Sequence, residues 1–197
     1  MKENKVKATV GVFAGIINEK GKLLLRRRIE TGSITPGKSF KGCWELPGGG
    51  VEVSESMPYC HLVNELKREI KEEVGIEIDS IDPMPDMYPV YFGKVSDLAL
   101  VTPINSDKEP TTGETKWVDL KELNKLAKDY KAADREKGQD GQGIVSGWGK
   151  RMHCMALAAF ANSERHSYDR ALRCFHDKAL SEKEEAKQVL SEIKEKW

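Results

Sequence analysis

The stretch from about residue 58 to residue 74 constrains the fold most, because its apolar residues recur at helical spacing. These residues are Val63, Leu66, Ile70 and Val74. At about 100° per residue they share one side of an α-helix, which then has to pack that side against the rest of the chain. Gly75 follows directly, as is typical of a helix C-terminus. The sequence therefore predicts an amphipathic helix with one buried side.

Glutamates gather beside this apolar stripe. Glu69, Glu72 and Glu73 stand at i, i+3 and i+4, and Glu65 lies one turn earlier. Like charges at this spacing repel one another by roughly 0.2–0.5 kcal/mol per pair. Cations that prefer oxygen ligands, such as Mg²⁺ or Mn²⁺, relieve that repulsion. The alternative is a solvated face whose charge is neutralised by the basic residues of the same helix.

A glycine-rich segment, Pro47 followed by Gly48, Gly49 and Gly50, precedes the helix. Taken alone it is an ordinary turn, but such a turn also lets backbone amides or carbonyls come close to a ligand. Arg68, beside the first of the clustered glutamates, can hold carboxylates through bidentate hydrogen bonds. A glycine turn that leads into an acidic helix suits a site for a metal and a phosphate group, with a carboxylate as base.

The remaining elements follow from periodicity and from turn residues. Strands are expected at residues 6–18, 23–28, 44–46, 76–81, 88–95, 98–104 and 115–118, the first two as a hairpin. Helices are expected at residues 58–74, from the capping box of Asp119 and Glu122 to about 128, at 144–161 and within 164–197. This order of strands and helices indicates an α+β or mixed α/β fold.

The length of 197 residues suits one domain with an appendage. We expect the domain at residues 1–162 and a helical C-terminal extension at 163–197. One edge of the extension is apolar and needs a partner surface, either the domain itself or a second copy in a homodimer. Deletion of residues 164–197 should therefore lower solubility or change the assembly state, which light scattering and a melting temperature would detect.

Composition and charge argue against a nucleic-acid partner, a membrane span and a secreted protein. Lys and Arg total 32, as do Asp and Glu, so no basic excess indicates a nucleic-acid partner. No apolar run approaches the ~20 residues that span a bilayer, and the charged N-terminus does not resemble a signal peptide. We therefore expect a soluble, cytoplasmic protein with reduced cysteines. The C-terminal histidines and cysteines match no zinc signature.

The acidic helix resembles a known signature. The nine residues from Arg68 to Ile76 match the second half of the Nudix box, REUxEExGU with U apolar, at every fixed position. Gly49 and Glu55 fill the first half. The approach from Trp44 to Gly49 is typical of the family, and the stretch at residues 113–119 is similar to a late strand of these proteins. The resemblance covers about residues 6–161.

One departure from the box lies between its two halves. The family places seven residues between the glutamate and the arginine, whereas twelve separate Glu55 from Arg68 here. The five extra residues sit around residues 57–61, before or at the start of the helix, where they lengthen the loop and leave the spacing of the later glutamates unchanged.

The resemblance implies the Nudix fold, a mixed sheet between helices, and attack of water on a phosphorus atom of a nucleoside diphosphate linked to another group. It implies Glu69, Glu72, Glu73 and the carbonyl of Gly48 as ligands of Mg²⁺ or Mn²⁺, with Arg68 orienting the glutamates. Glu114 is the candidate base outside the box, with a surface acid as the equal alternative. Substrate-binding candidates are Gly48, Gly49, Arg26, Arg28 and Trp44. Strand alternation places Arg26 and Arg28 on one face and Arg27 on the other.

The substrate stays open among nucleoside triphosphates, ADP-ribose or nucleotide sugars, and dinucleoside polyphosphates. One alternative function is a nucleotide sensor on the same fold that binds without cutting, since fold does not fix function. A prenyl diphosphate isomerase would need an additional cysteine and glutamate pair, which the sequence does not provide in a recognisable place.

Overall fold

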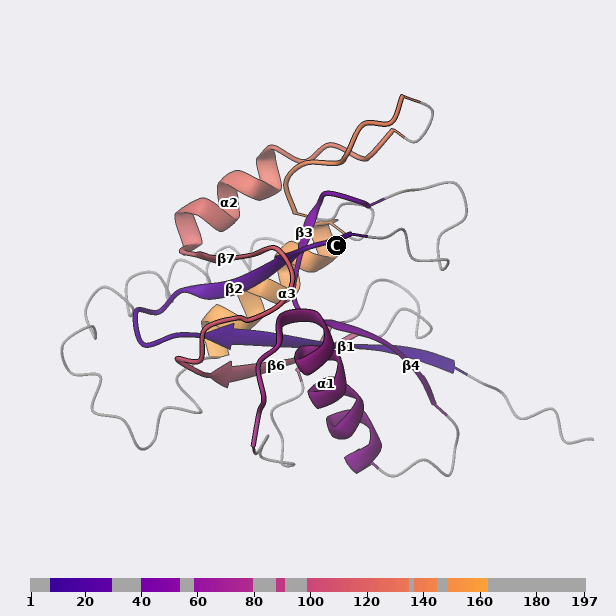
Figure 1. Ribbon diagram of the computed structural model, residues 1–197, viewed down its shortest axis with the longest axis vertical. Helices are drawn as coiled ribbons and strands as arrows, with labels where there is room; N and C mark the ends of the chain where they lie inside the picture. The colour runs from indigo at the N-terminus through magenta and orange to yellow at the C-terminus, as the bar shows by residue number, and fades with distance from the viewer. Residues whose placement is uncertain are drawn as a thin grey trace, which may run out of the picture.

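Strand β1 (Ala8–Ile17) is the centre of the fold, since strands β2, β4 and β6 all pair with it (Figure 1). The computed structural model describes residues 8–29, 40–53, 59–79, 88–90, 99–134, 137–144 and 149–162. β1 consists largely of apolar and β-branched residues, which favour an extended backbone with both faces buried.

Within the described residues the sheet has seven strands. Besides β1 they are β2 (Leu23–Arg27), β3 (Trp44–Glu45), β4 (Gly48–Val53), β5 (Tyr88–Val90), β6 (Ala99–Asn105) and β7 (Thr115–Val118). Their order is β3-β2-β1-β6-β5, with β4 also paired to β1 and β7 to β2. β1 and β6 run parallel, and the other pairs are antiparallel. The sheet is mixed, which confirms the predicted fold class.

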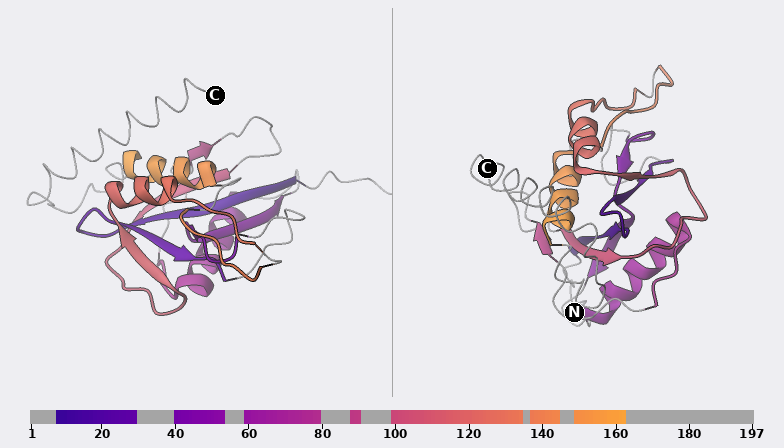
Figure 2. Two further views of the ribbon diagram at one scale, coloured as in Figure 1. Left: turned by 90° about the horizontal axis from the view of Figure 1, so that it is seen from above. Right: turned by 90° about the vertical axis from the view of Figure 1, so that its left-hand side faces the viewer.

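Helices cover both faces of the sheet (Figure 2). Helix α1 (Tyr59–Val74) lies on one face, and α2 (Leu120–Lys128) and α3 (Gly149–Asn162) lie on the other. Successive residues of β1 point to opposite faces of the sheet. Val12, Ala14 and Ile16 join the core under α1, whereas Phe13 and Ile17 join the core under α2 and α3. The sheet between helices is therefore as expected.

Helix α1 has the predicted buried stripe. Val63, Leu66, Ile70 and Val74 are all buried in the core on that face. The helix ends at Val74, as expected. Gly75 stops it by adopting a left-handed backbone conformation with a φ of 69°. The loop before β7 closes this end, since the N–H of Thr111 donates to the carbonyl of Val74 at 3.0 Å.

The glycine segment is not the turn predicted from sequence. Gly48 to Val53 form strand β4, which pairs with β1 over six residues from Ala8 to Phe13. Glycine has a low intrinsic strand preference, but here it lets the strand run close to β1 and to α1. The physical reason for the wrong prediction is that tertiary packing overrides local preference.

Two other expectations need correction. Residues 76–79 form no strand, although Ile76 is buried in the core beneath α1 and Ile78 packs against it. The helix expected at residues 144–161 does not include Ile144, and its described part is α3 (Gly149–Asn162). Ile144 instead bridges Trp44 in parallel, and its N–H donates to the carbonyl of Leu126 at 3.1 Å.

Several expectations fall outside the described residues. These are the insertion as far as residue 58, most of the strand expected at 88–95, and the extension at 163–197. The rest of the insertion, residues 59–61, forms the start of α1. In the described part of the chain, no helix is both long and apolar enough to cross a membrane. Of the described thiols, Cys43 is buried and Cys60 is exposed, and both are free. Burial raises the pKa of the Cys43 thiol to about 11.

Candidate active site

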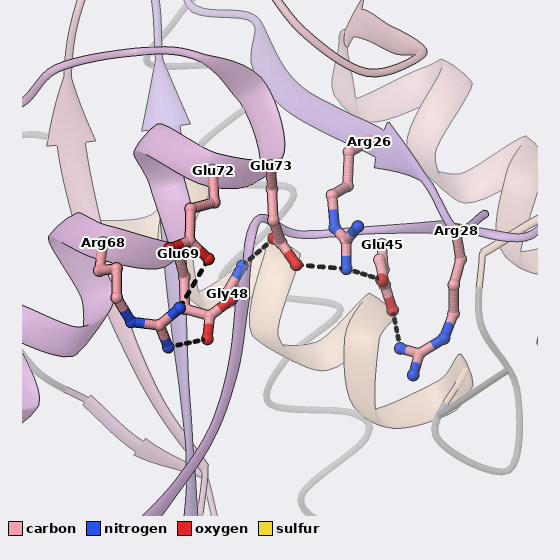
Figure 3. Close-up of polar contacts among 8 residues, drawn as sticks. All are labelled: Arg26, Arg28, Glu45, Gly48, Arg68, Glu69, Glu72 and Glu73. Carbon is pink, nitrogen blue, oxygen red and sulfur yellow. Dashed lines mark hydrogen bonds and ion pairs between the residues drawn. The ribbon is translucent and has the colours of Figure 1, made fainter. Parts of the chain in front are cut away.

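Two glycines at the start of β4 bring carboxylates of α1 against the sheet (Figure 3). Gly48 has a φ of +142°, and its N–H donates to Oε2 of Glu73 at 2.8 Å. At Gly49, an added Cβ would lie 2.9 Å from Cδ and Oε1 of Glu69. A larger residue at Gly49 would displace the Glu69 carboxylate, whereas one at Gly48 would clash with Val12 and Phe13 of β1, so the two glycines allow a close junction between strand and helix.

Arg68 holds three glutamates of its own helix. Its guanidinium donates to Glu65, to Oε1 of Glu69 at 2.6 Å and to Oε2 of Glu72 at 2.6 Å. The hydrogen bonds to Glu65 and the charge of Glu69 raise the pKa of Arg68 further above its usual range. The arginine thereby offsets the mutual repulsion of the acidic face and fixes its side chains.

Glu73 faces the interior of the same junction. Its side chain is 14% exposed, and its Oε1 lies 2.6 Å from Nη2 of Arg26. Burial raises the pKa of Glu73 to about 7, although Arg26 and the N–H of Gly48 both act to lower it. Arg26 and the Gly48 N–H therefore do not fully offset the burial of this carboxylate, and a cation at this position would stabilise its charged form.

Glu45 is a charged residue of the site that the sequence did not single out. It pairs with Arg26 across β2 and β3, and its side chain is only 1% exposed. Its Oε1 lies 2.6 Å from Nη2 of Arg26, and its Oε2 accepts from Nη1 of Arg28 at 2.7 Å. A carboxylate among apolar neighbours, opposite alternating arginines, is the signal that could have identified it.

The structure gathers most of the predicted site residues in one place. Gly48, Gly49, Glu69 and Glu73 meet where β4 contacts α1. The other members of the assembly are Arg26, Arg28, Arg68 and Glu72 (Figure 3). The two arginines of β2 share a face, because both contact Glu45.

Glu114 and Trp44 lie apart from this group. Glu114, 58% exposed, accepts from Nη1 of Arg27, which projects to the other face of β2. Trp44 packs against the core under α2 and α3, with the ammonium of Lys116 4.5 Å from the centre of its ring. Neither side chain contacts the box glutamates in the interactions that the structure shows.

The donor set fits a hard divalent cation. Among the residues that the structure describes, no three acidic, histidine or cysteine side chains are arranged to hold a metal ion. The glutamates are instead engaged by Arg68 and Arg26. The donors are nevertheless carboxylate oxygens on adjacent turns, set against a glycine backbone that leaves room for them. Oxygen donors of this kind match Mg²⁺ and Mn²⁺, and such a cation would displace the arginine contacts.

One family model matches most of the chain. The model of the NUDIX domain matches residues 6–138 of this chain. No curated protein has a sequence that matches it.

The chain is similar to several solved structures, among them the following three. The C-terminal domain of mouse MUTYH, in complex with human PCNA, is 14% identical with a TM-score of 0.48, over 85% of this chain and 97% of that one. The MutT protein of Methanosarcina mazei Go1 is 26% identical with a TM-score of 0.35, over 59% and 80%. The NUDIX domain of Shewanella oneidensis NrtR, complexed with ADP ribose, is 17% identical with a TM-score of 0.39, over 60% and 77%.

Proposed function

The chain belongs to the Nudix family, and from that premise we propose that it is a divalent-metal-dependent hydrolase. Its reaction is the hydrolysis of a pyrophosphate bond in a nucleoside diphosphate linked to another group. One observation carries the proposal: two carboxylates from adjacent turns of α1, those of Glu69 and Glu73, lie against the glycine backbone of β4. Such a junction can admit a cation and the phosphate groups of a substrate together.

The metal ligands of the proposal are Glu69, Glu72, Glu73 and the carbonyl of Gly48, with Mg²⁺ or Mn²⁺ as the cation. When bound, the cation supplies positive charge to the phosphate oxygens and makes water more acidic. Arg68 keeps the outer glutamates aligned in the absence of the cation, since it contacts two of them at 2.6 Å. A cation beside Glu73 would also offset the burial that raises the pKa of this carboxyl to about 7.

Substrate phosphates are proposed to meet the arginines of β2. Arg26 and Arg28 face the glutamate side of the sheet, and guanidinium groups recognise phosphate oxygens through paired hydrogen bonds. Gly48 and Gly49 let the phosphate groups approach the backbone. Trp44 is the further substrate-binding candidate, through the edge of its ring, because Lys116 covers one face.

Glu114 is proposed as the base outside the box. It follows Gly113, and an added Cβ on that glycine would lie 2.6 Å from the carbonyl oxygen of Glu73. The backbone of Glu114 is therefore close to the end of α1, although its carboxylate is paired with Arg27. The side chain is 58% exposed, and to act as the base it would have to leave Arg27.

The test is a panel of nucleoside triphosphates, ADP-ribose, nucleotide sugars and dinucleoside polyphosphates, each with Mg²⁺ and with Mn²⁺. The native protein is compared with Glu72→Gln and Glu73→Gln. We expect both variants to lower kcat/KM by about a hundredfold or more, since each loses a negative donor. Glu77→Gln is the matched control, because Glu77 is an exposed glutamate just beyond the same helix that pairs with Lys71.

Three outcomes separate the possible functions. Turnover that fails in both box variants but not in the control supports the hydrolase. Tight binding of one compound without turnover identifies the nucleotide sensor instead. Turnover at the native rate in both box variants contradicts the proposed ligand set. The cytoplasmic location and the homodimer expected from the sequence stay predictions.

A further inference from the structure

Arg26 lies between two carboxylates and contacts both with the same nitrogen. Its Nη2 is 2.6 Å from Oε1 of Glu73 and 2.6 Å from Oε1 of Glu45. Figure 3 shows the resulting row, in which Glu73, Arg26, Glu45 and Arg28 follow one another. Negative and positive groups alternate and their formal charges cancel, which is how partly buried charges are tolerated.

The two ends of the row differ in exposure and in role. Glu45 is 1% exposed, accepts a hydrogen bond from Arg28 through Oε2, and faces Arg26 through Oε1 as an ion pair without a hydrogen bond. Glu73 is a proposed metal ligand and has to change partners when a cation binds. Arg26 and the cation therefore compete for the Glu73 carboxylate. A second carboxylate that holds Arg26 weakens its competition with the cation.

We propose that Glu45 is a positioning residue that promotes cation binding at Glu73 by retaining Arg26. In the apo protein Arg26 contacts both carboxylates. With a cation at Glu73, Arg26 keeps a full charge partner in Glu45 and is not left as an unpaired, largely buried charge. This inference rests on the proposed function, because it takes Glu73 as a ligand, and it adds a residue outside the box to the control of metal affinity.

The experiment measures Mn²⁺ binding to the substrate-free full-length protein by titration calorimetry. In the Glu45→Gln variant, Arg26 has only Glu73 left as a carboxylate partner in the row, so it competes more strongly with Mn²⁺ for Glu73. We expect the Kd for Mn²⁺ to rise about tenfold, which corresponds to about 1.4 kcal/mol. Asp140→Asn is the matched control, since Asp140 also pairs with two basic side chains, Arg27 and Lys41, on the other face of β2. Its Mn²⁺ affinity should equal that of the native protein.

A double-mutant cycle tests whether Glu45 acts through Arg26. In Arg26→Gln the competitor is absent, so Mn²⁺ should bind at least as tightly as in the native protein. Adding Glu45→Gln to that variant should then change the Kd by no more than about twofold. An equal loss of affinity with and without Arg26 would overturn the proposal, because it would indicate a general structural effect.

The Glu45→Asp variant separates the effect of the carboxylate's position from that of its charge. It also replaces Glu45→Gln as the test if circular dichroism shows that Glu45→Gln is unfolded. Aspartate keeps the negative charge but withdraws the carboxylate by one methylene group. Weaker Mn²⁺ binding in Glu45→Asp supports positioning, and unchanged binding overturns it. Glu73→Gln identifies a failure of the premise. If that variant binds Mn²⁺ as the native protein does, the ligand set is wrong; if it binds weakly while both Glu45 variants bind normally, only this inference is wrong.

Discussion

At the scale of the residue, Gly48 and Gly49 are neighbours with different reasons to be glycine. At Gly48 the backbone has a φ of +142°, and an added Cβ would overlap the carbonyl oxygen of Val12 and lie 2.7 Å from Cα of Phe13. At Gly49 the nearest atoms belong to the carboxylate of Glu69, the far end of a flexible side chain. The first glycine is required by the backbone, and the second by the position of a proposed ligand.

This difference predicts opposite phenotypes for two alanine variants. Gly48→Ala should lower the free energy of unfolding by about 2–5 kcal/mol, because backbone strain adds to a clash with fixed atoms. Gly49→Ala should cost less than about 1 kcal/mol but lower the Mn²⁺ affinity about tenfold or more, since Glu69 has to move. Urea denaturation and calorimetry measure the two quantities. Equal losses of stability in both variants would contradict the assignment.

The site was only partly predictable from residue types. The spacing of Glu69, Glu72 and Glu73 predicts a shared helix face, because it depends on helix geometry alone. The contacts of Arg26 depend on the pairing of β2 with β3 and on the docking of α1, which no local pattern encodes. Glu45 went unnoticed for the same reason, since its burial between two arginines is a tertiary property.

At the scale of the element, periodicity predicted the described helices α1, α2 and α3 and most of the described strands, and it failed where a glycine or a turn decides the structure. The stripe of α1 and its end at Gly75 follow from a repeated pattern summed over 16 residues. Strand β4 has three glycines and little local preference for a strand, so its pairing with β1 had to come from the assembled sheet. Residues 76–79 show the converse, an apolar pattern that packs into the core without forming a strand.

The contact between β1 and α3 yields a prediction at this scale. An added Cβ at Gly15 would overlap Cβ of Ala159, so the missing side chain lets α3 lie close to the sheet. Gly15→Ala should lower the free energy of unfolding by about 1–3 kcal/mol through overpacking. Chemical denaturation measures it.

A compensating variant provides the control for this contact. Ala159→Gly removes the opposing methyl group and by itself costs about 1 kcal/mol in helix propensity. In that background Gly15→Ala should be clearly less destabilising, because the overlapping atom is gone. Strictly additive effects of the two changes would show that the contact does not limit the approach of α3.

At the scale of the whole molecule, the side of the sheet away from the glutamates contains a buried titratable group. Nε2 of His153 in α3 donates to Oδ1 of Asn124 in α2 at 2.8 Å. Burial lowers the pKa of His153 to about 4, from an ordinary value of 6.5. The folded protein thus keeps this imidazole neutral at pH values where the unfolded chain protonates it.

This shift predicts a loss of stability in mild acid. Between pH 6.5 and 4 the unfolded state binds more protons at His153 than the folded state does, so stability falls as the pH falls through that window. At pH 5 the loss from this group is on the order of 2 kcal/mol relative to pH 7. His153→Gln should remove that part of the pH dependence, as measured by urea denaturation at both pH values. An unchanged difference between pH 7 and pH 5 would contradict the role of His153.

The three partners of β1 also set an order of assembly during synthesis. The pairs with β2 and β4 and the docking of α1 use residues 8–74, which leave the ribosome as one continuous run. The parallel pair with β6 joins Val12 to Leu100 and has to wait for the later chain. Closing so long a loop is slow compared with local pairing. The glutamate site is therefore built on the part of the sheet that can form cotranslationally, while one edge of β1 stays open to mispairing until β6 emerges.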